Sequence, residues 1–240
     1  NDKSGYSVSS AGDVNGDGFD DLIIGAKYAS RNSQYSGSSF VVFGGRNTAS
    51  SVTLGTSDAD TLTGTSGANQ IVAGQGDDAI TGAGGADILR AGAGNDTINI
   101  GDTSFSVIDG GSGNDTLQLS SGVSLDLTSI ANNKLNSIEI IDINGAGTTV
   151  TLGDDDIISI VGSNAENDLK IKGSSGDAVN ISSSGFNSIG QATTIDSVTY
   201  DIFTNPALNS SVRLLIDQDL TVTEPALSTI ELSNIETNLN

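Results

Sequence analysis

Aspartate recurs at a fixed place in a nine-residue repeat between Gly55 and Gln118, and this repeat carries the clearest candidate chemistry of the chain. Six of the seven units have a glycine-rich turn, an acidic or amide residue at the sixth place and an aliphatic residue two places later. The sixth unit has lost this turn, carries Phe105 at the sixth place and has one extra residue before its aliphatic residue. The aliphatic residue is never missing: Leu62, Ile71, Ile80, Leu89, Ile98, Ile108 and Leu117. A disordered Gly/Asp-rich linker is the alternative, and the unbroken aliphatic place argues against it.

A unit of six turn residues and three strand residues predicts half a coil of a flattened solenoid. Glycine allows the positive φ angles of a stacked turn, and a short strand points one side chain inward. Two units make one coil, so units of equal parity stack on the same edge. One edge then carries Asp60, Asp78, Asp96 and Asp115, and the other carries Asn69, Asp87 and Phe105. The sixth unit, Ile100 to Asp109, has ten residues, and we expect it to keep the register of the first edge.

Stacked carboxylates repel one another unless a cation lies between them. Calcium fits, because it accepts several oxygen ligands and glycine-rich turns point backbone carbonyls inward. The units GAGGADILR and GGSGNDTLQ resemble the haemolysin-type calcium-binding (RTX) repeat, which implies a parallel β-roll with calcium between stacked turns. We expect three ions along the Asp60 to Asp115 edge and at most one between the Asn69 and Asp87 turns. The predicted ligands are Asp60, Asn69, Gly74, Gly76, Asp78, Asp87, Gly92, Gly94, Asp96, Gly111, Gly113 and Asp115.

A second acidic motif lies near the start of the chain, between Asp13 and Asp21. Oxygen-bearing side chains at loop places one, three, five and nine, with Gly18 at place six, predict a calcium loop. Ile24 stands where an EF-hand needs glutamate, and the flanks, Tyr6 to Ser10 and Leu22 to Ile24, are typical of strands. An Asx-rich hairpin turn without metal is the alternative. The segment GYSVSSAGDVNGDGFDDLIIGA, with the later FVVFGG, resembles the FG-GAP repeat of integrin α-subunit propellers. This resemblance implies one calcium ion held by Asp13, Asn15, Asp17, Asp21 and the Phe19 carbonyl.

One propeller-like blade leaves open sheet edges, which natural proteins seldom tolerate. We therefore expect further blades in a longer protein, packing of the blade on its own solenoid, or docking on another subunit. Head-to-tail self-association into a filament or surface layer, or binding to other cell-surface components, would also cover these edges.

Composition excludes several kinds of site. The chain has 30 acidic and 9 basic residues, a net charge of -21, which disfavours nucleic acid and anionic membranes and favours cations. It has no Cys or His, and therefore no disulfide, no zinc or haem site built on these residues and no Ser-His-Asp triad. No hydrophobic run is long enough for a membrane span, and no signal peptide opens the sequence. We expect a mature fragment, or export that does not depend on an N-terminal signal.

After Gln118 the repeat stops, but β-type alternation continues. Short strands are predicted at Val123–Leu127, Ile138–Ile143, Thr148–Leu152, Leu169–Ile171 and Ala178–Ile181, with one helical turn at Asp154–Ile160. The longer runs Thr194–Phe203 and Val212–Val222 predict an antiparallel hairpin, and Thr229–Leu232 a last strand. The fold class is all-β: a propeller-like blade over residues 1–48, a β-roll over 49–120, an irregular β-solenoid over 121–190 and a hairpin region over 191–240.

No catalytic site is predicted, so we expect no enzyme. Metal ligation explains the repeated aspartates better than glycoside hydrolysis does, and Lys170 and Lys172 are expected to face solvent. The segments after Gln118 resemble those that follow RTX repeats in large bacterial surface proteins. We therefore expect a secreted, extracellular or cell-surface bacterial module, structural or adhesive, that folds when calcium binds. The alternative is the calcium-binding, secretion-associated C-terminal region of a larger secreted hydrolase.

Overall fold

The computed structural model describes residues 7–12, 14, 21–26, 38–42, 52–143, 145, 147–161, 168–183, 185–207 and 212–225. The chain divides into two compact units, residues 1–48 and residues 49–240. The predicted strand Thr229–Leu232 lies outside the described residues.

The first unit contains a three-stranded antiparallel sheet of order β1-β2-β3, formed by β1 (Ser7–Gly12), β2 (Asp21–Ala26) and β3 (Ser38–Val42). The register between β1 and β2 shifts between Ser10 and Gly12, so the pairing is bulged there. Asp21, the last residue of the predicted calcium loop, begins β2 and is fully buried. The strands expected on both sides of that loop are therefore present.

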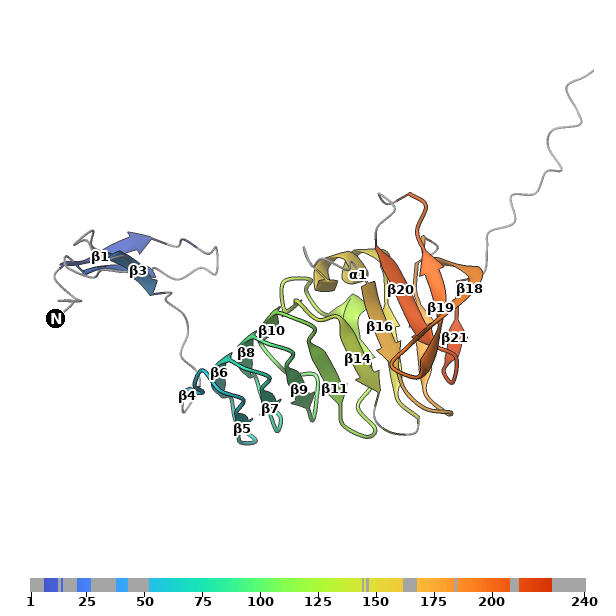
Figure 1. Cartoon of the computed structure of the whole chain (residues 1–240), viewed down its shortest axis with the longest axis horizontal. Coiled ribbons are helices and arrows are strands. Elements are labelled where there is room, and N and C mark those ends of the chain that lie inside the picture. Colours follow the sequence, from blue (N-terminus) through green and yellow to red (C-terminus); the bar gives the residue numbers. More distant parts are fainter. Residues whose placement is uncertain are drawn as a thin grey trace, which may run out of the picture. The chain divides into compact units, whose positions relative to one another are not determined.

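Residues 52–119 form a parallel β-roll whose two faces are built by alternating strands (Figure 1). One face consists of β4 (Val52–Leu54), β6 (Gln70–Gln75), β8 (Ile88–Ala93) and β10 (Val107–Ser112). The other consists of β5 (Thr61–Thr63), β7 (Ala79–Thr81), β9 (Thr97–Ile100) and β11 (Thr116–Leu119). Ile71 pairs with Leu89, and Ile80 with Ile98, so one coil takes 18 residues and the all-β, parallel-roll prediction is confirmed.

The aliphatic residues of the repeat fill the interior of the roll. Exposure is at most 1% for Ile71, Ile80, Leu89, Ile98, Ile108 and Leu117. The ten-residue unit adds its extra residue in the turn before β10, because Ile108 still pairs with Leu89 and Leu117 with Ile98. Phe105, which stands where other units carry an acid, is buried in that turn with an exposure of 3%.

The solenoid continues beyond the repeat with the same parallel stacking (Figure 1). The nine-stranded sheet is extended by β14 (Ile140–Ile143), β16 (Asp168–Lys172) and β20 (Arg213–Asp217). A four-stranded sheet contains β12 (Leu125–Asp126), β15 (Thr149–Leu152), β17 (Ala178–Ile181) and β21 (Thr221–Thr223). The first face of the roll is extended by β13 (Leu135–Asn136), which pairs in parallel with β10 and makes that sheet five-stranded. Three insertions interrupt the coils: the 3-10 turn η1 (Leu127–Ser129), the helix α1 (Asp154–Val161), and the hairpin of β18 (Asn187–Ile195) and β19 (Val198–Thr204).

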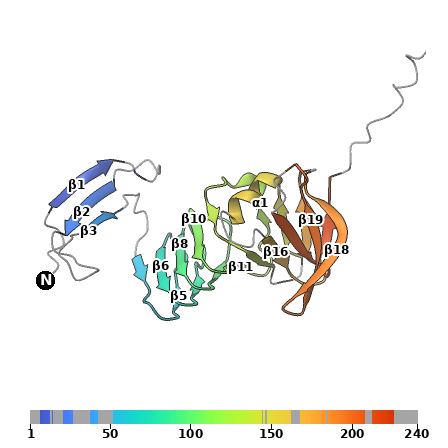
Figure 2. The same cartoon turned by 45° about the horizontal axis from the view of Figure 1, so that its top comes forward.

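The predicted run Thr194–Phe203 is not one strand. A turn at Asp196 and Ser197, with φ angles of 49° and 69°, divides it into the ends of β18 and β19. The run Val212–Val222 is also divided, since β20 and β21 belong to different sheets. The expected antiparallel pairing exists between β19 and β20, at the C-terminal end of the solenoid (Figure 2).

The hairpin also corrects the expectation for Lys170, one of the two lysines of β16. Lys170 is 5% exposed, because Tyr200, Ile202 and Leu215 form a small second core on the outer side of the sheet. Lys172 keeps a side-chain exposure of 36% and forms an ion pair of 3.1 Å with Asp142.

Candidate cation sites between stacked turns

The turns of the roll stack into two edges. We call the edge formed by turns 55–60, 73–78, 91–96 and 110–115 the carboxylate edge, and the edge formed by turns 64–69, 82–87 and 101–106 the second edge. Along the carboxylate edge each aspartate N–H donates to Oδ1 of the aspartate one coil later. These distances are 2.8 Å from Asp60 to Asp78, 2.7 Å from Asp78 to Asp96 and 2.8 Å from Asp96 to Asp115.

The other carboxylate oxygen of three of these aspartates is buried without a hydrogen-bond partner. This applies to Oδ2 of Asp78, Asp96 and Asp115, whose residues are 2%, 1% and 0% exposed. A buried anionic oxygen without a donor is strongly unfavourable, so these three positions fit a bound cation. Among the described residues, no group of three or more acidic side chains forms a metal cluster, and a cation here would take its remaining ligands from backbone carbonyls.

Two buried aspartates of this edge, Asp96 and Asp115, have a raised pKa in the absence of a cation. Burial raises the pKa of the Asp115 carboxyl to about 7, against the hydrogen bond from the Asp96 N–H, and the charges of Glu139, Asp96 and Asp109 raise it further. Burial also raises the pKa of Asp96, with Asp78 and Asp77 adding repulsion. A divalent cation would reverse both effects, because it favours the charged carboxylate.

Glycine is required in these turns because the coils approach closely. A Cβ at Gly92 would lie 2.1 Å from the carbonyl oxygen of Gly74, and a Cβ at Gly111 would lie 2.1 Å from that of Gly92. The result is a column of backbone carbonyls beside the column of carboxylates. All six glycines predicted as ligands have positive φ angles: Gly74, Gly76, Gly92, Gly94, Gly111 and Gly113.

In the first turn of the carboxylate edge, a threonine provides hydrogen-bond donors to the second carboxylate oxygen of the aspartate. Asp60 Oδ2 accepts from the Thr56 N–H at 2.6 Å and from Thr56 Oγ1 at 2.9 Å. Later turns of this edge have Gly74, Gly92 and Gly111 at the place of Thr56, so they lack this hydroxyl. Their backbone differs too, since these three glycines have positive φ angles and Thr56 does not. The unpartnered oxygens begin with Asp78, the first aspartate whose turn has glycine at this place.

The second edge has a similar protein contact at its first turn. Asn69 Oδ1 lies 3.2 Å from both the N–H and Oγ1 of Thr65, and its amide nitrogen donates to the Gly67 carbonyl. Asp87 Oδ1 accepts from the Asn69 N–H at 2.8 Å, and burial raises the pKa of Asp87. Phe105 ends the series, so this edge contains one acidic side chain at the sixth place.

The predicted calcium loop of the first unit is described at its end. Asp21 Oδ2 accepts from the Val14 N–H at 2.7 Å, which closes the loop across seven residues. Asp13, Asn15, Asp17 and Phe19 lie outside the described residues. The ligand set of this loop therefore stays a prediction.

Sequence reasoning missed Glu139, which follows Asp115 on the carboxylate edge. The Asp115 N–H donates to Glu139 Oε2 at 2.6 Å, and Glu139 is 3% exposed. A signal was present, since Glu139-Ile140-Ile141 repeats the order acid, any residue, aliphatic found in Asp115-Thr116-Leu117, and these strands pair in register.

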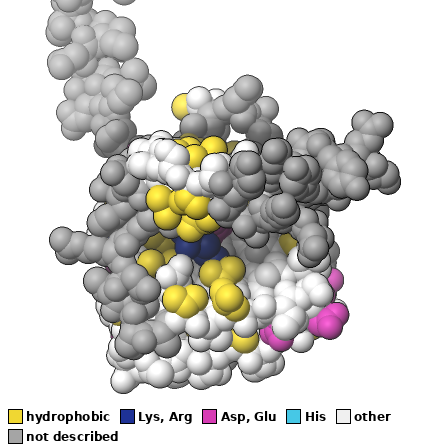
Figure 3. All heavy atoms as spheres, turned by 90° about the vertical axis from the view of Figure 1, so that its left-hand side faces the viewer, with side chains coloured by type: hydrophobic (Ala, Val, Ile, Leu, Met, Phe, Trp, Pro, Cys, Tyr) yellow, Lys and Arg dark blue, Asp and Glu magenta, His cyan; other side chains and the backbone are white. Residues whose placement is uncertain are grey.

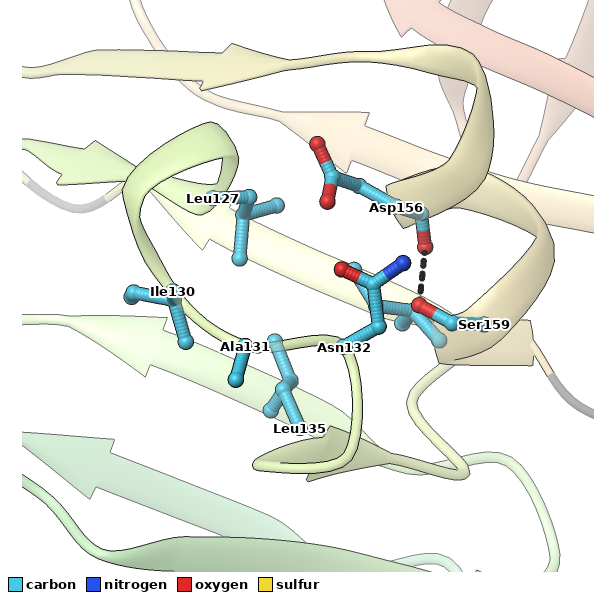
Figure 4. A pocket seen from close by; sticks show the side chains of 8 residues that line it. Leu127, Ile130, Ala131, Asn132, Leu135, Asp156 and Ser159 are labelled. Atoms are coloured by element: carbon cyan, nitrogen blue, oxygen red, sulfur yellow. Dashed lines mark hydrogen bonds between the residues drawn. The ribbon is translucent and has the colours of Figure 1, made fainter.

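The cavity drawn in Figure 4 is too small to bind a ligand. It has a volume of about 10 Å³ and lies between η1, β13 and α1, which is room for no more than about one water molecule. The Asp156 carboxylate accepts from the Gly153 N–H at 2.8 Å and caps the first turn of α1, and Ser159 Oγ donates to the Asp156 carbonyl at 3.0 Å.

Comparison with protein families assigns both motifs. The FG-GAP repeat family matches residues 4–42. The RTX calcium-binding nonapeptide repeat (4 copies) matches residues 54–89, 81–99 and 100–123. The chain carries RTX calcium-binding repeats and one FG-GAP repeat. No curated protein and no solved structure matches the chain.

The RTX assignment makes calcium the cation expected at the stacked turns. Both repeats are structural or binding modules, and both are typical of secreted or surface proteins. Among the described residues, no helix is long and apolar enough to cross a membrane.

Proposed function

We propose that this chain is an extracellular, calcium-stabilised structural module of a bacterial surface protein, and that calcium binding outside the cell drives the folding of its roll. The three unpartnered carboxylate oxygens of Asp78, Asp96 and Asp115 support this most directly. Three ions on the carboxylate edge would equal these oxygens in number. The second edge, with Asp87 and a self-bonded Asn69, would bind at most one more ion.

We expect the apolar burial in the roll to be too small to stabilise it without metal. The coil from Gln70 to Asp87 buries the aliphatic side chains Ile71, Ala73 and Ile80. Two contributions oppose folding of this coil: the entropy lost when 18 residues become ordered, and the repulsion between stacked carboxylates. Calcium binding energy would therefore appear as folding energy.

A calcium titration followed by circular dichroism tests the proposal. Starting in excess chelator, we expect β-sheet signal to rise as calcium is added, and magnesium at the same ionic strength to be a poor substitute because it demands smaller, octahedral coordination. An unchanged β-sheet signal in chelator would refute calcium-dependent folding.

Adhesion or self-assembly is a second candidate, favoured by exposed apolar side chains. In the first unit Leu22, Ile23, Phe40, Val41 and Val42 are 38–48% exposed on a sheet of three strands. Leu54 of β4, at the end of the five-stranded sheet, is 71% exposed. Exposed hydrophobic side chains are also visible on the face drawn in Figure 3.

Light scattering separates assembly from a monomeric module. A head-to-tail assembly predicts a mass that grows with protein concentration in calcium at the millimolar level of extracellular sites. A constant monomer mass would reject it. The hydrolase alternative predicts a catalytic domain encoded next to this chain, which the sequence of the complete gene product would reveal.

A further inference from the structure

The carboxylate edge does not end where the RTX repeat ends. Glu139 accepts from the Asp115 N–H at 2.6 Å, as Asp115 accepts from the Asp96 N–H at 2.8 Å one coil earlier. The RTX match stops at residue 123, so Glu139 belongs to the next coil of the solenoid. A buried acid from outside the repeat thus continues the column.

The turn that carries Glu139 stacks on turn 110–115 as one repeat turn stacks on another. A Cβ at Gly55 would lie 2.1 Å from the Ala73 carbonyl oxygen and 2.8 Å from Asp60 Oδ2. A Cβ at Gly110 would lie 2.0 Å from the Ser137 carbonyl oxygen and 2.7 Å from Asp115 Oδ2. The Ser137 carbonyl and the unpartnered Asp115 oxygen therefore converge beside Gly110.

Two features allow this turn, which lies outside the repeat, to place a carboxylate beside Asp115. Ser137 has a φ of 53°, in the left-handed region that several glycines of the repeat turns and Ala83 also adopt. Only two positions separate Ser137 from Glu139, whereas five separate Gly110 from Asp115. The additional methylene of glutamate compensates for the shorter turn and brings its carboxylate to the Asp115 N–H.

Asp177 shows how a buried acid in this solenoid avoids the need for a cation. It makes the same contact with a preceding coil, since the Thr148 N–H donates to Asp177 Oδ1 at 3.0 Å. Its second oxygen accepts from the N–H and Oγ of Ser174, at 3.2 and 3.0 Å. Asp115 Oδ2 has no such donor.

We infer that turns 110–115 and 137–139 form a calcium site of their own, with Asp115 Oδ2 and the Ser137 carbonyl as ligands and Glu139 as the second carboxylate. The inference rests on the proposed calcium binding of the roll. The sequence predicts three ions between the turns of Asp60 and Asp115. The inference instead places the three ions one coil closer to the C-terminal end, between the turns of Asp78 and Glu139. The turn of Thr56 and Asp60 then binds no ion. The last ion then joins the RTX roll to the following solenoid.

Native mass spectrometry of the full chain, with calcium titrated in, tests this site. Glu139→Gln keeps an oxygen acceptor for the Asp115 N–H but removes the charge. We expect one ion fewer at intermediate calcium, with affinity for that ion lowered about 10- to 100-fold. The matched control Asp177→Asn, a buried acid with both oxygens bonded to protein donors, should keep the wild-type ion count.

An unchanged ion count and affinity in Glu139→Gln would overturn the site and would indicate that protein groups, such as the neighbouring Lys170, neutralise Glu139. If Glu139→Gln fails to fold by circular dichroism, Glu139→Asp decides, because it keeps the charge but shortens the reach. Weaker binding of one ion in that variant supports the site, and wild-type binding refutes it. Absence of bound calcium in the wild-type roll would instead refute the proposed function itself.

Discussion

Gly111 shows how little space the stacked turns leave. A methyl group there would lie 2.1 Å from the Gly92 carbonyl oxygen, and φ is 100°. We predict that Gly111→Ala lowers the free energy of unfolding in calcium by about 1–3 kcal/mol from backbone strain alone, and further because the carbonyl column is displaced. Urea unfolding in saturating calcium measures the change.

Gly122→Ala is the matched control for this substitution. Its φ is 80°, but an added Cβ would meet nothing within 4 Å. We expect it to cost only the strain of a left-handed alanine, about 1–2 kcal/mol. Equal losses in the two variants would show that close stacking at Gly111 does not matter.

Asp156 gives the protein a pH dependence that is separate from the calcium turns. Burial raises its pKa, against the hydrogen bond from the Gly153 N–H, and the charges of Asp155 and Asp126 add to the rise. The folded state therefore holds this proton more tightly than the unfolded state. Its contribution to stability is fully present below the unfolded pKa and is lost as pH rises through the folded pKa.

Asp156→Asn removes this titration while keeping an oxygen for the Gly153 N–H. We predict that the variant is more stable than wild type at neutral pH, and that the difference shrinks as pH falls toward about 4, the usual range of an aspartate. Urea unfolding at several pH values, in saturating calcium, provides the comparison. If the difference in stability between variant and wild type stays constant with pH, titration of Asp156 is not a source of the pH dependence.

The hairpin of β18 and β19 illustrates what sequence patterns do not reveal. Asp196 and Ser197 both adopt positive φ angles, as in the tight two-residue turns that usually carry Asn-Gly or Asp-Gly. Asp and Ser are common in turns, but without a glycine the pair lacks the strongest hairpin signal, and the alternation of apolar residues runs through it. The interruption was therefore not predictable from residues 194–203.

Replacing Ser197 by glycine should favour this hairpin. Glycine adopts the observed φ of 69° without strain, so we predict that Ser197→Gly raises the free energy of unfolding by about 1 kcal/mol. Ser188→Gly, in the extended part of β18, should lower it by about 0.5–1 kcal/mol instead. A destabilised Ser197→Gly variant would contradict the turn geometry.

Residues 55–118 were predictable because a local rule repeats there. The aliphatic place determines the inward side chain, and parity determines which aspartates meet, including the register across the ten-residue unit. The ends of the carboxylate edge were not predictable in the same way. Closure of the first turn by Thr56 and continuation of the column by Glu139 depend on contacts between coils, which the nine-residue pattern does not encode.

The two parts of the solenoid differ in how they are stabilised. In the roll, the coil Gln70–Asp87 buries Ile71, Ala73 and Ile80, and the coil 88–106 buries Leu89, Ala91, Ile98, Ile100 and Phe105. The segment 138–161 buries eight hydrophobic side chains: Ile138, Ile141, Ile143, Val150, Leu152, Ile157, Ile160 and Val161. Apolar burial stabilises in proportion to area, so the later coils depend less on metal than the roll does.

Hydrogen exchange with mass spectrometry should reveal this difference within one molecule. On addition of chelator we predict that amides in residues 61–119 lose protection, whereas those in β16, β17 and β20 keep most of theirs. Sodium chloride at matched ionic strength should not restore protection in the roll, because screening does not replace ligands for buried oxygens. Uniform loss of protection along residues 61–223 would instead mean that calcium stabilises the whole solenoid as one cooperative unit.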